Sequence, residues 1–222
     1  MKKFSIALDT CVGSGSLAVY ENEERVYSRI GFLGRASEVT PLEALESALF
    51  EKDLEIKGLE ELFLTRGPGS FTGVRTGLSI ARGLREAMDL TVRTCTVFEA
   101  LSVVGAERPF LTAVFAGSRE VACQVWPEAP DGEGNKPSEG SKILAHSGLK
   151  DFLDEIDVRK MIAEPRCYAA LDVERLASDG FVVLSSGDDV AALARRFILD
   201  PHTYESGYNL EAVYTREFAP GG

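Results

Sequence analysis

The first thirty residues alternate between hydrophobic and polar positions in short segments, which is the pattern of half-buried β-strands. Residues 4–9 and 16–20 show this pattern on either side of a Gly/Ser-rich turn at 13–15, and residues 25–30 repeat it after a glutamate-rich turn. Two such runs joined by a short glycine-containing turn predict a β-hairpin. We therefore expect the chain to open with a hairpin that a third strand extends.

The next segment carries the signals of a helix start. Thr40-Pro-Leu-Glu43 has the S/T-x-x-E spacing of a capping box, with proline at the first helical position. This predicts a helix that runs to about Glu51, followed by a strand at 59–64. The apolar face of the predicted helix consists of Leu42, Leu45 and Leu49.

Residues 67–84 read GPGSFTGVRTGLSIARGL, a glycine-rich turn that leads into a helix of small residues. Ser70 or Thr72 is expected to cap this helix. The free backbone N–H groups at the start of the helix, next to Gly69, could bind a phosphate group. Within the helix, small residues recur every fourth position and form a flat stripe that lets a second helix approach closely. The alternative is that this stripe packs within its own lobe. The stripe consists of Gly73, Gly77 and Ala81.

The remaining pattern predicts a second lobe. It begins with strands at 110–116 and 121–126, which form a hairpin, after a strand at 91–94 closes the first lobe. Further on we expect helices at 149–156, 168–177 and 190–199, and strands at 159–163 and 181–184. The predicted division is a first lobe at 1–104, a second at 105–200 with a mobile polar loop at 130–141, and a tail at 201–222. Two lobes that each open with a hairpin suggest an ancient duplication.

Composition narrows the class of protein. The chain has 222 residues, 45% of them hydrophobic, and a net charge of -11, which disfavours direct binding of nucleic acid. Residues 66–93 nevertheless carry a local positive charge, which is either a solvated helix face or a surface for an acidic partner or a phosphate. Four scattered cysteines and the absence of a signal-like N-terminus predict a cytoplasmic protein. The arginines of the positive segment are Arg66, Arg75, Arg82, Arg85 and Arg93.

With these features in view, the chain resembles the TsaB (YeaZ-type) family, relatives of sugar kinases, Hsp70 and actin. The resemblance is specific at residues 67–84. Weaker likenesses extend it to about residues 1–218, at Leu8-Asp-Thr10, Thr96-Val-Phe-Glu-Ala-Leu101, Ser118-Arg-Glu-Val121 and Tyr214-Thr-Arg216. It implies a two-lobed actin/Hsp70/sugar-kinase-like (ASKHA) α/β fold with mixed sheets.

The resemblance also implies a function. Members of this family serve in forming threonylcarbamoyladenosine at position 37 of tRNAs that read ANN codons. The family member is a noncatalytic subunit that pairs with the transferase TsaD, the ATPase TsaE joins the pair, and the free chain is a homodimer. Both pairings use the first two helices. The expected contacts are Leu42, Leu45, Leu49, Gly73, Gly77 and Ala81, with Arg75 and Arg82 beside them, while tRNA is held mainly by the other subunits.

Catalytic residues are harder to find. The transferase binds metal through HxxxH, and the corresponding positions here, Val97 and Leu101, are apolar and cannot ligate. The two histidines, His146 and His202, are expected at the surface, and Arg35-Ala-Ser-Glu38 stands where many members have a histidine. We therefore predict no catalytic or metal site.

Nucleotide binding stays open. ATP or ADP with Mg²⁺ is conceivable within the complex, through Asp9, Thr10, Ser14, Gly69, Ser70 and Thr72. The alternative for Asp9 is that it bonds only local backbone groups. An enzyme that hydrolyses nucleotide through Asp9, or a glycoprotease-like peptidase, is the second hypothesis for the whole chain.

Overall fold

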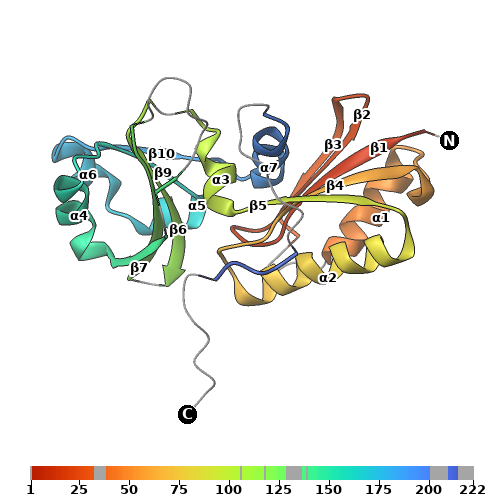
Figure 1. Cartoon of the computed structure of the whole chain (residues 1–222), viewed down its shortest axis with the longest axis horizontal. Coiled ribbons are helices and arrows are strands. Elements are labelled where there is room, and N and C mark those ends of the chain that lie inside the picture. The colour runs from red at the N-terminus through yellow and green to blue at the C-terminus, as the bar shows by residue number, and fades with distance from the viewer. Residues whose placement is uncertain are drawn as a thin grey trace, which may run out of the picture.

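The computed structural model describes residues 2–32, 39–105, 107–117, 119–128, 137–138, 140–200 and 210–214. Two five-stranded mixed sheets with flanking helices lie in the two halves of the molecule (Figure 1). This architecture confirms the predicted two-lobed α/β fold with mixed sheets. None of the helices formed by the described residues is long and apolar enough to cross a membrane.

The first sheet has the strand order β3-β2-β1-β4-β5. The three opening strands pair antiparallel, as predicted: β1 (Phe4–Asp9), β2 (Ser16–Glu21) and β3 (Glu24–Ile30). Two further strands continue the sheet parallel to β1: β4 (Leu59–Thr65) and β5 (Thr91–Cys95). Because parallel neighbours end at the same edge of a sheet, β1 and β4 bring Asp9 next to Thr65.

Two helices cover one face of this sheet (Figure 1): α1 (Pro41–Glu51) and α2 (Phe71–Ala87). Thr40 caps α1 with the predicted capping box, because its hydroxyl accepts from the N–H of Glu43 and the Glu43 carboxylate accepts from the N–H of Thr40. Ser70 caps α2 by accepting from the N–H of Gly73, at 3.3 Å. Of the two predicted caps for α2, Ser70 is therefore the one used. A one-turn η1 (Ile56–Gly58) precedes β4.

The second sheet has the order β10-β9-β6-β7-β8. Its antiparallel strands are β6 (Phe110–Gly117), β7 (Glu120–Trp126) and β8 (Lys142–Ala145), and β9 (Lys160–Ala163) and β10 (Val182–Ser185) are parallel to β6. Starting from β8, the strand order of the second sheet repeats that of the first sheet starting from β3: three antiparallel strands are followed by two that run parallel to the third. The repeated topology supports the duplication that the two hairpins suggest.

The remaining helices differ in which sheet they cover. The second lobe carries η2 (His146–Gly148), α4 (Leu149–Glu155), α5 (Pro165–Ala170) and α6 (Val173–Ser178). The last helix, α7 (Val190–Leu199), instead packs on β1 and β4 of the first sheet, on the face opposite α1 and α2, beside α3 (Val97–Ser102) (Figure 1). The division between residues 104 and 105 stays a prediction. It assigns α7 to the second lobe, whereas α7 packs on the sheet of the first lobe.

Some predicted elements need correction. The helix expected at 168–177 is two helices, because the chain turns extended at Leu171 and Asp172 then caps α6 by accepting from the N–H of Arg175. Sequence reasoning missed β8, whose four residues are too few for a clear pattern. Most of the predicted loop at 130–141 and of the tail at 201–222 lies outside the described residues.

Candidate functional site

The glycine turn between β4 and α2 packs against the end of β1, backbone against backbone. The N–H of Ser70 donates to the carbonyl of Cys11 at 2.7 Å. A Cβ on Gly69 would lie 2.1 Å from that carbonyl oxygen, and Gly67 has a φ of +103° that side chains rarely adopt. The glycines of this turn therefore let it contact the loop that follows β1. The Ser70 N–H, which the phosphate hypothesis assigned to a ligand, is bonded to the Cys11 carbonyl.

The stripe Gly73, Gly77 and Ala81 faces the sheet, and all three residues are buried. The Thr10 hydroxyl donates to the carbonyl of Gly73 at 2.7 Å. A Cβ on Gly77 would lie 2.4 Å from Thr10 Oγ1 and 3.2 Å from Leu64 Cδ1. The structure corrects the prediction that this stripe contacts a partner, because the stripe packs within its own lobe. Enlarging Gly77 would disturb the fold and not only an interface.

The outward face of α2 carries a second run of small residues that sequence reasoning missed. Thr72, Ser79 and Gly83 are exposed and Thr76 is half-buried. Nothing lies within 4 Å of the position that a Cβ on Gly83 would take. Both runs have helical spacing, so the sequence alone does not say which of them faces the sheet.

The Asp9 carboxyl is enclosed by groups of its own chain. Asp9 is 1% exposed, and its Oδ1 accepts from the N–H of Cys11 at 3.1 Å and from the Thr65 hydroxyl. Its Oδ2 accepts from the N–H of Val12 at 3.4 Å. Two of these donors are local backbone groups, as the alternative for Asp9 expects, and the third is the side chain of Thr65 on β4. Ser14 lies half-buried in the turn between β1 and β2.

Burial controls the ionisation of this carboxyl. It raises the pKa of Asp9 to about 6, and the three hydrogen bonds that it accepts oppose the rise. Burial, with the Asp9 charge second, also raises the pKa of the Cys11 thiol. A thiol whose pKa is raised carries little thiolate, so Cys11 does not have the character of a nucleophile.

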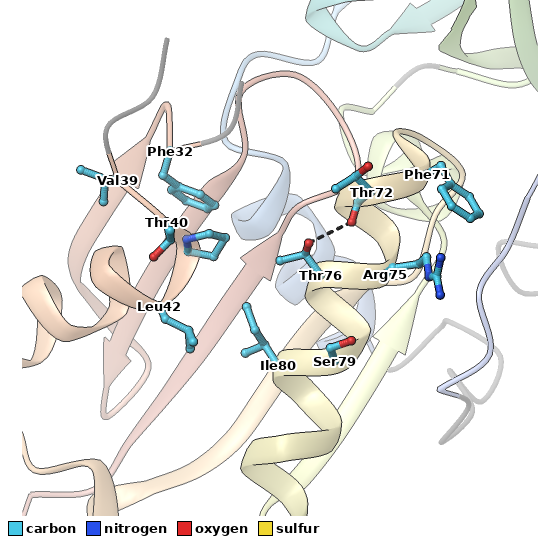
Figure 2. A pocket seen from close by; sticks show the side chains of 11 residues that line it. Phe32, Val39, Thr40, Leu42, Phe71, Thr72, Arg75, Thr76, Ser79 and Ile80 are labelled. Carbon is cyan, nitrogen blue, oxygen red and sulfur yellow. Dashed lines mark hydrogen bonds between the residues drawn. The ribbon is translucent and has the colours of Figure 1, made fainter. Parts of the chain in front are cut away.

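Between α1 and α2 the structure has an open groove of about 750 Å³ (Figure 2). Leu42 and Ile80 point toward each other across it, and Phe32 and Val39 lie at its end (Figure 2). Leu42 is 50% exposed. An apolar groove between two helices, with polar groups at its rim, has the character of a protein-binding surface. We call this feature the α1/α2 groove; its other lining residues are Thr40, Pro41, Phe71, Thr72, Arg75, Thr76 and Ser79.

The structure separates the other predicted contact residues. Leu45 is buried and Leu49 packs on the core, so of the predicted leucine face only Leu42 is exposed. Arg75 lies over the Phe71 ring at 5.1 Å, and Arg82 donates to the carbonyl of Leu210 at 2.8 Å. Sequence reasoning missed Phe71 and also Phe50, which is 91% exposed, because neither fits the apolar face that it assigned.

The positions aligned with the transferase's HxxxH lie in α3. Val97 and Leu101 are both completely buried among core residues. His146 is half-buried in η2, while His202 and the segment 35–38 lie outside the described residues. The described ranges contain no group of three or more His, Cys, Asp or Glu side chains that could hold a metal ion.

The chain is similar to proteins of known description. The family model described as "TsaD: tRNA N6-adenosine threonylcarbamoyltransferase" matches residues 32–125. Two similar curated relatives are both described as "tRNA threonylcarbamoyladenosine biosynthesis protein TsaB". The one from Haemophilus influenzae is 26% identical over 95% of this chain and 92% of its own length. The one from Bacillus subtilis is 27% identical over 45% of this chain and 44% of its own length, so that match spans less than half of the relative.

Solved structures agree on the fold. One described as YeaZ from Pseudomonas aeruginosa aligns with a TM-score of 0.64 at 18% identity, over 96% of this chain and 99% of that chain. Another, of a P. aeruginosa protein with similarity to peptidase YeaZ, aligns with a TM-score of 0.66 at 19% identity, over 96% and 100% of the two chains. At such identities the structures speak for the fold alone, and they confirm the predicted fold class. In sequence the chain is similar to the TsaB relatives, and in fold it is similar to the YeaZ structures.

Proposed function

We propose that this chain serves in the biosynthesis of threonylcarbamoyladenosine in tRNA, as a noncatalytic subunit that pairs with a TsaD-type transferase. Two relatives described as tRNA threonylcarbamoyladenosine biosynthesis proteins support the pathway. The observation that carries the pairing is the α1/α2 groove, which exposes Leu42 opposite Ile80. It lies within residues 32–125, the stretch that matches the TsaD family model. A TsaD-type chain would therefore present a related pair of helices, and two such pairs would form a four-helix contact.

The outward face of α2 suits such a contact. Its small residues allow a partner helix to approach closely: Thr72, Thr76 and Ser79 line the groove, and Gly83 lies further along the helix. The same surface would serve the homodimer of the free chain, so the two pairings would compete. In this proposal TsaE joins the pair, and tRNA modification proceeds on the TsaD-type subunit.

Charge supports an indirect role toward tRNA. The chain has a net charge of -11, and several arginines of the positive segment are engaged within the protein. Arg93 pairs with Glu61 at 3.1 Å, Arg82 bonds the Leu210 carbonyl and Arg75 covers Phe71. The enzyme hypothesis has less support, since Asp9 is enclosed by bonds from its own chain.

The test is a substitution in the groove with a matched control outside it. Leu42→Asp puts a charge on a side chain that is 50% exposed in the groove, and Val182→Asp does the same at a 48% exposed position on β10. A central apolar contact contributes about 2 kcal/mol, so we expect Leu42→Asp to weaken binding to a purified TsaD-type partner by about 30-fold in calorimetry. Val182→Asp should bind like the wild type.

Reconstituted tRNA modification should fall with the same variant. Both variants should unfold at wild-type denaturant concentrations, since both side chains are half exposed. Equal affinity of Leu42→Asp and wild type would refute pairing through this groove. Full tRNA modification by the transferase in the absence of this chain would refute the subunit role.

A further inference from the structure

The chain segment Leu210–Tyr214 returns to α2 and lies along it, on the side away from α1. The carbonyl of Leu210 accepts from Arg82 Nη2 at 2.8 Å, near the end of the helix. The N–H of Val213 donates to the carbonyl of Arg66 at 2.8 Å, just before the helix begins. This segment, coloured blue, runs beside the start of α2 in Figure 1. The bonds at Leu210 and Val213 set the direction of the segment, which runs antiparallel to α2.

The glycine turn is shaped for this segment. A Cβ on Gly67 would lie 2.3 Å from the carbonyl oxygen of Val213. Leu210 and Ala212 pack against the hydrophobic cluster that contains the core of the first sheet. The segment therefore occupies a fitted position on the lobe and does not merely lie across its surface.

The segment ends in an exposed aromatic cluster. The ring of Tyr214 lies 5.5 Å from the ring of Phe71, and Arg75 covers Phe71 at 5.1 Å. Phe71 and Tyr214 are each 41% exposed. Figure 2 shows Phe71 and Arg75 pointing away from Leu42, on the other side of α2. Aromatic and arginine side chains held in fixed positions are the residue types that dominate protein interfaces.

We infer that α1, α2 and the segment 210–214 form one composite surface, on which Tyr214 and Phe71 contact the TsaD-type partner. This inference rests on the proposed function and adds residues to its interface. Phe71 and Arg75 line the α1/α2 groove and also form the aromatic cluster, so the two features are continuous. A partner helix pair seated on the groove and the outward face of α2 would meet the cluster at its edge.

A purely structural role for the segment 210–214 predicts a different effect of Tyr214 substitutions on partner affinity. If it only covered the glycine turn, removing the Tyr214 ring would leave partner affinity unchanged. The Tyr214 ring lies beyond the bond of Val213 to Arg66, so its removal spares the bonds that hold the segment. Partner affinity and stability of the free chain are therefore separate readouts.

The experiment compares Tyr214→Ala, Tyr214→Phe and Leu42→Asp in the full chain, by calorimetry with the purified TsaD-type partner. We expect Tyr214→Ala to raise Kd by about tenfold and Tyr214→Phe to stay within about twofold of wild type, because the ring makes the contact. Val213→Ala keeps the backbone bond to Arg66 and should leave Kd unchanged.

The outcomes separate the two proposals. A Tyr214→Ala variant with wild-type Kd, beside a Leu42→Asp variant that binds weakly, would overturn the composite surface and leave the groove standing. Wild-type Kd in both variants would overturn the groove as well. If Tyr214→Ala lowered the unfolding midpoint, Phe71→Leu would replace it, and wild-type affinity in a stable Phe71→Leu variant would count against the inference.

Discussion

Asp9 couples the stability of this fold to pH through a single buried carboxyl. Burial raises its pKa from 3.8 to about 6, so the folded chain holds the proton more tightly than the unfolded chain does. The stability that this proton binding adds is fully present below about pH 4 and is lost as pH rises through about 6. A shift of about two pKa units corresponds to about 3 kcal/mol, which is a large part of the stability of a typical domain.

The substitution Asp9→Asn tests this coupling. Asparagine keeps an acceptor for the N–H of Cys11 and for Thr65 but has no charge to bury. The unfolding free energy of the variant relative to wild type should therefore increase by about 2 kcal/mol between pH 4 and pH 7. Denaturant titrations at a series of pH values measure the difference, which separates Asp9 from Glu164, another buried carboxyl with a raised pKa. A difference that stays constant with pH would show that Asp9 ionises normally.

Among the elements, α2 has two faces that substitutions can tell apart. Gly77→Ala would place a Cβ 2.4 Å from Thr10 Oγ1, whereas Gly83→Ala would meet nothing within 4 Å. Alanine is favoured over glycine by about 1 kcal/mol in a helix interior. Gly83→Ala should therefore stabilise the free chain by about that amount, while Gly77→Ala should destabilise it by about 2 kcal/mol through overpacking. Chemical unfolding of the two variants checks this, and equal effects would mean that neither face of α2 is closely packed.

The same helix shows what sequence reasoning reaches and where it stops. Local signals were sufficient for the opening strands, for the capping box at Thr40 and for the start of α2, because each depends on residues within one turn or one strand. They did not reveal which small-residue stripe faces the sheet. That depends on Thr10, which follows β1 and approaches Gly73 and Gly77 from more than sixty residues away in the chain.

The candidate site shows the same division. The helices that carry it were predicted, but of the leucine face only Leu42 is exposed, since α1 buries Ala44, Leu45 and Ala48 against the sheet. Phe71 and Tyr214 lie 143 residues apart and meet only because the chain returns to α2. No periodicity within a single segment indicates such a contact, which is set by tertiary packing.

At the scale of the whole molecule, α7 follows the strands of the second lobe in sequence but packs on the sheet of the first lobe. Ala191, Ala194 and Phe197 are buried in one cluster with Ile6 and Phe63 of the first sheet. Phe152 of α4 belongs instead to a separate cluster in the second lobe. The two clusters should behave as different units in partial unfolding, with α7 following the sheet that it covers.

Native-state hydrogen exchange tests this with two matched core substitutions. Phe197→Leu removes part of a ring that is 1% exposed in the first cluster, and Phe152→Leu does so at a 7% exposed position in the second. Each should cost about 1 kcal/mol. We expect Phe197→Leu to speed the exchange of α7, β1 and β4 amides together while α4 and β10 keep their protection, and Phe152→Leu to do the reverse. If α7 instead lost protection with α4 in the Phe152→Leu variant, the helix would belong energetically to the second lobe, as its place in the chain suggests.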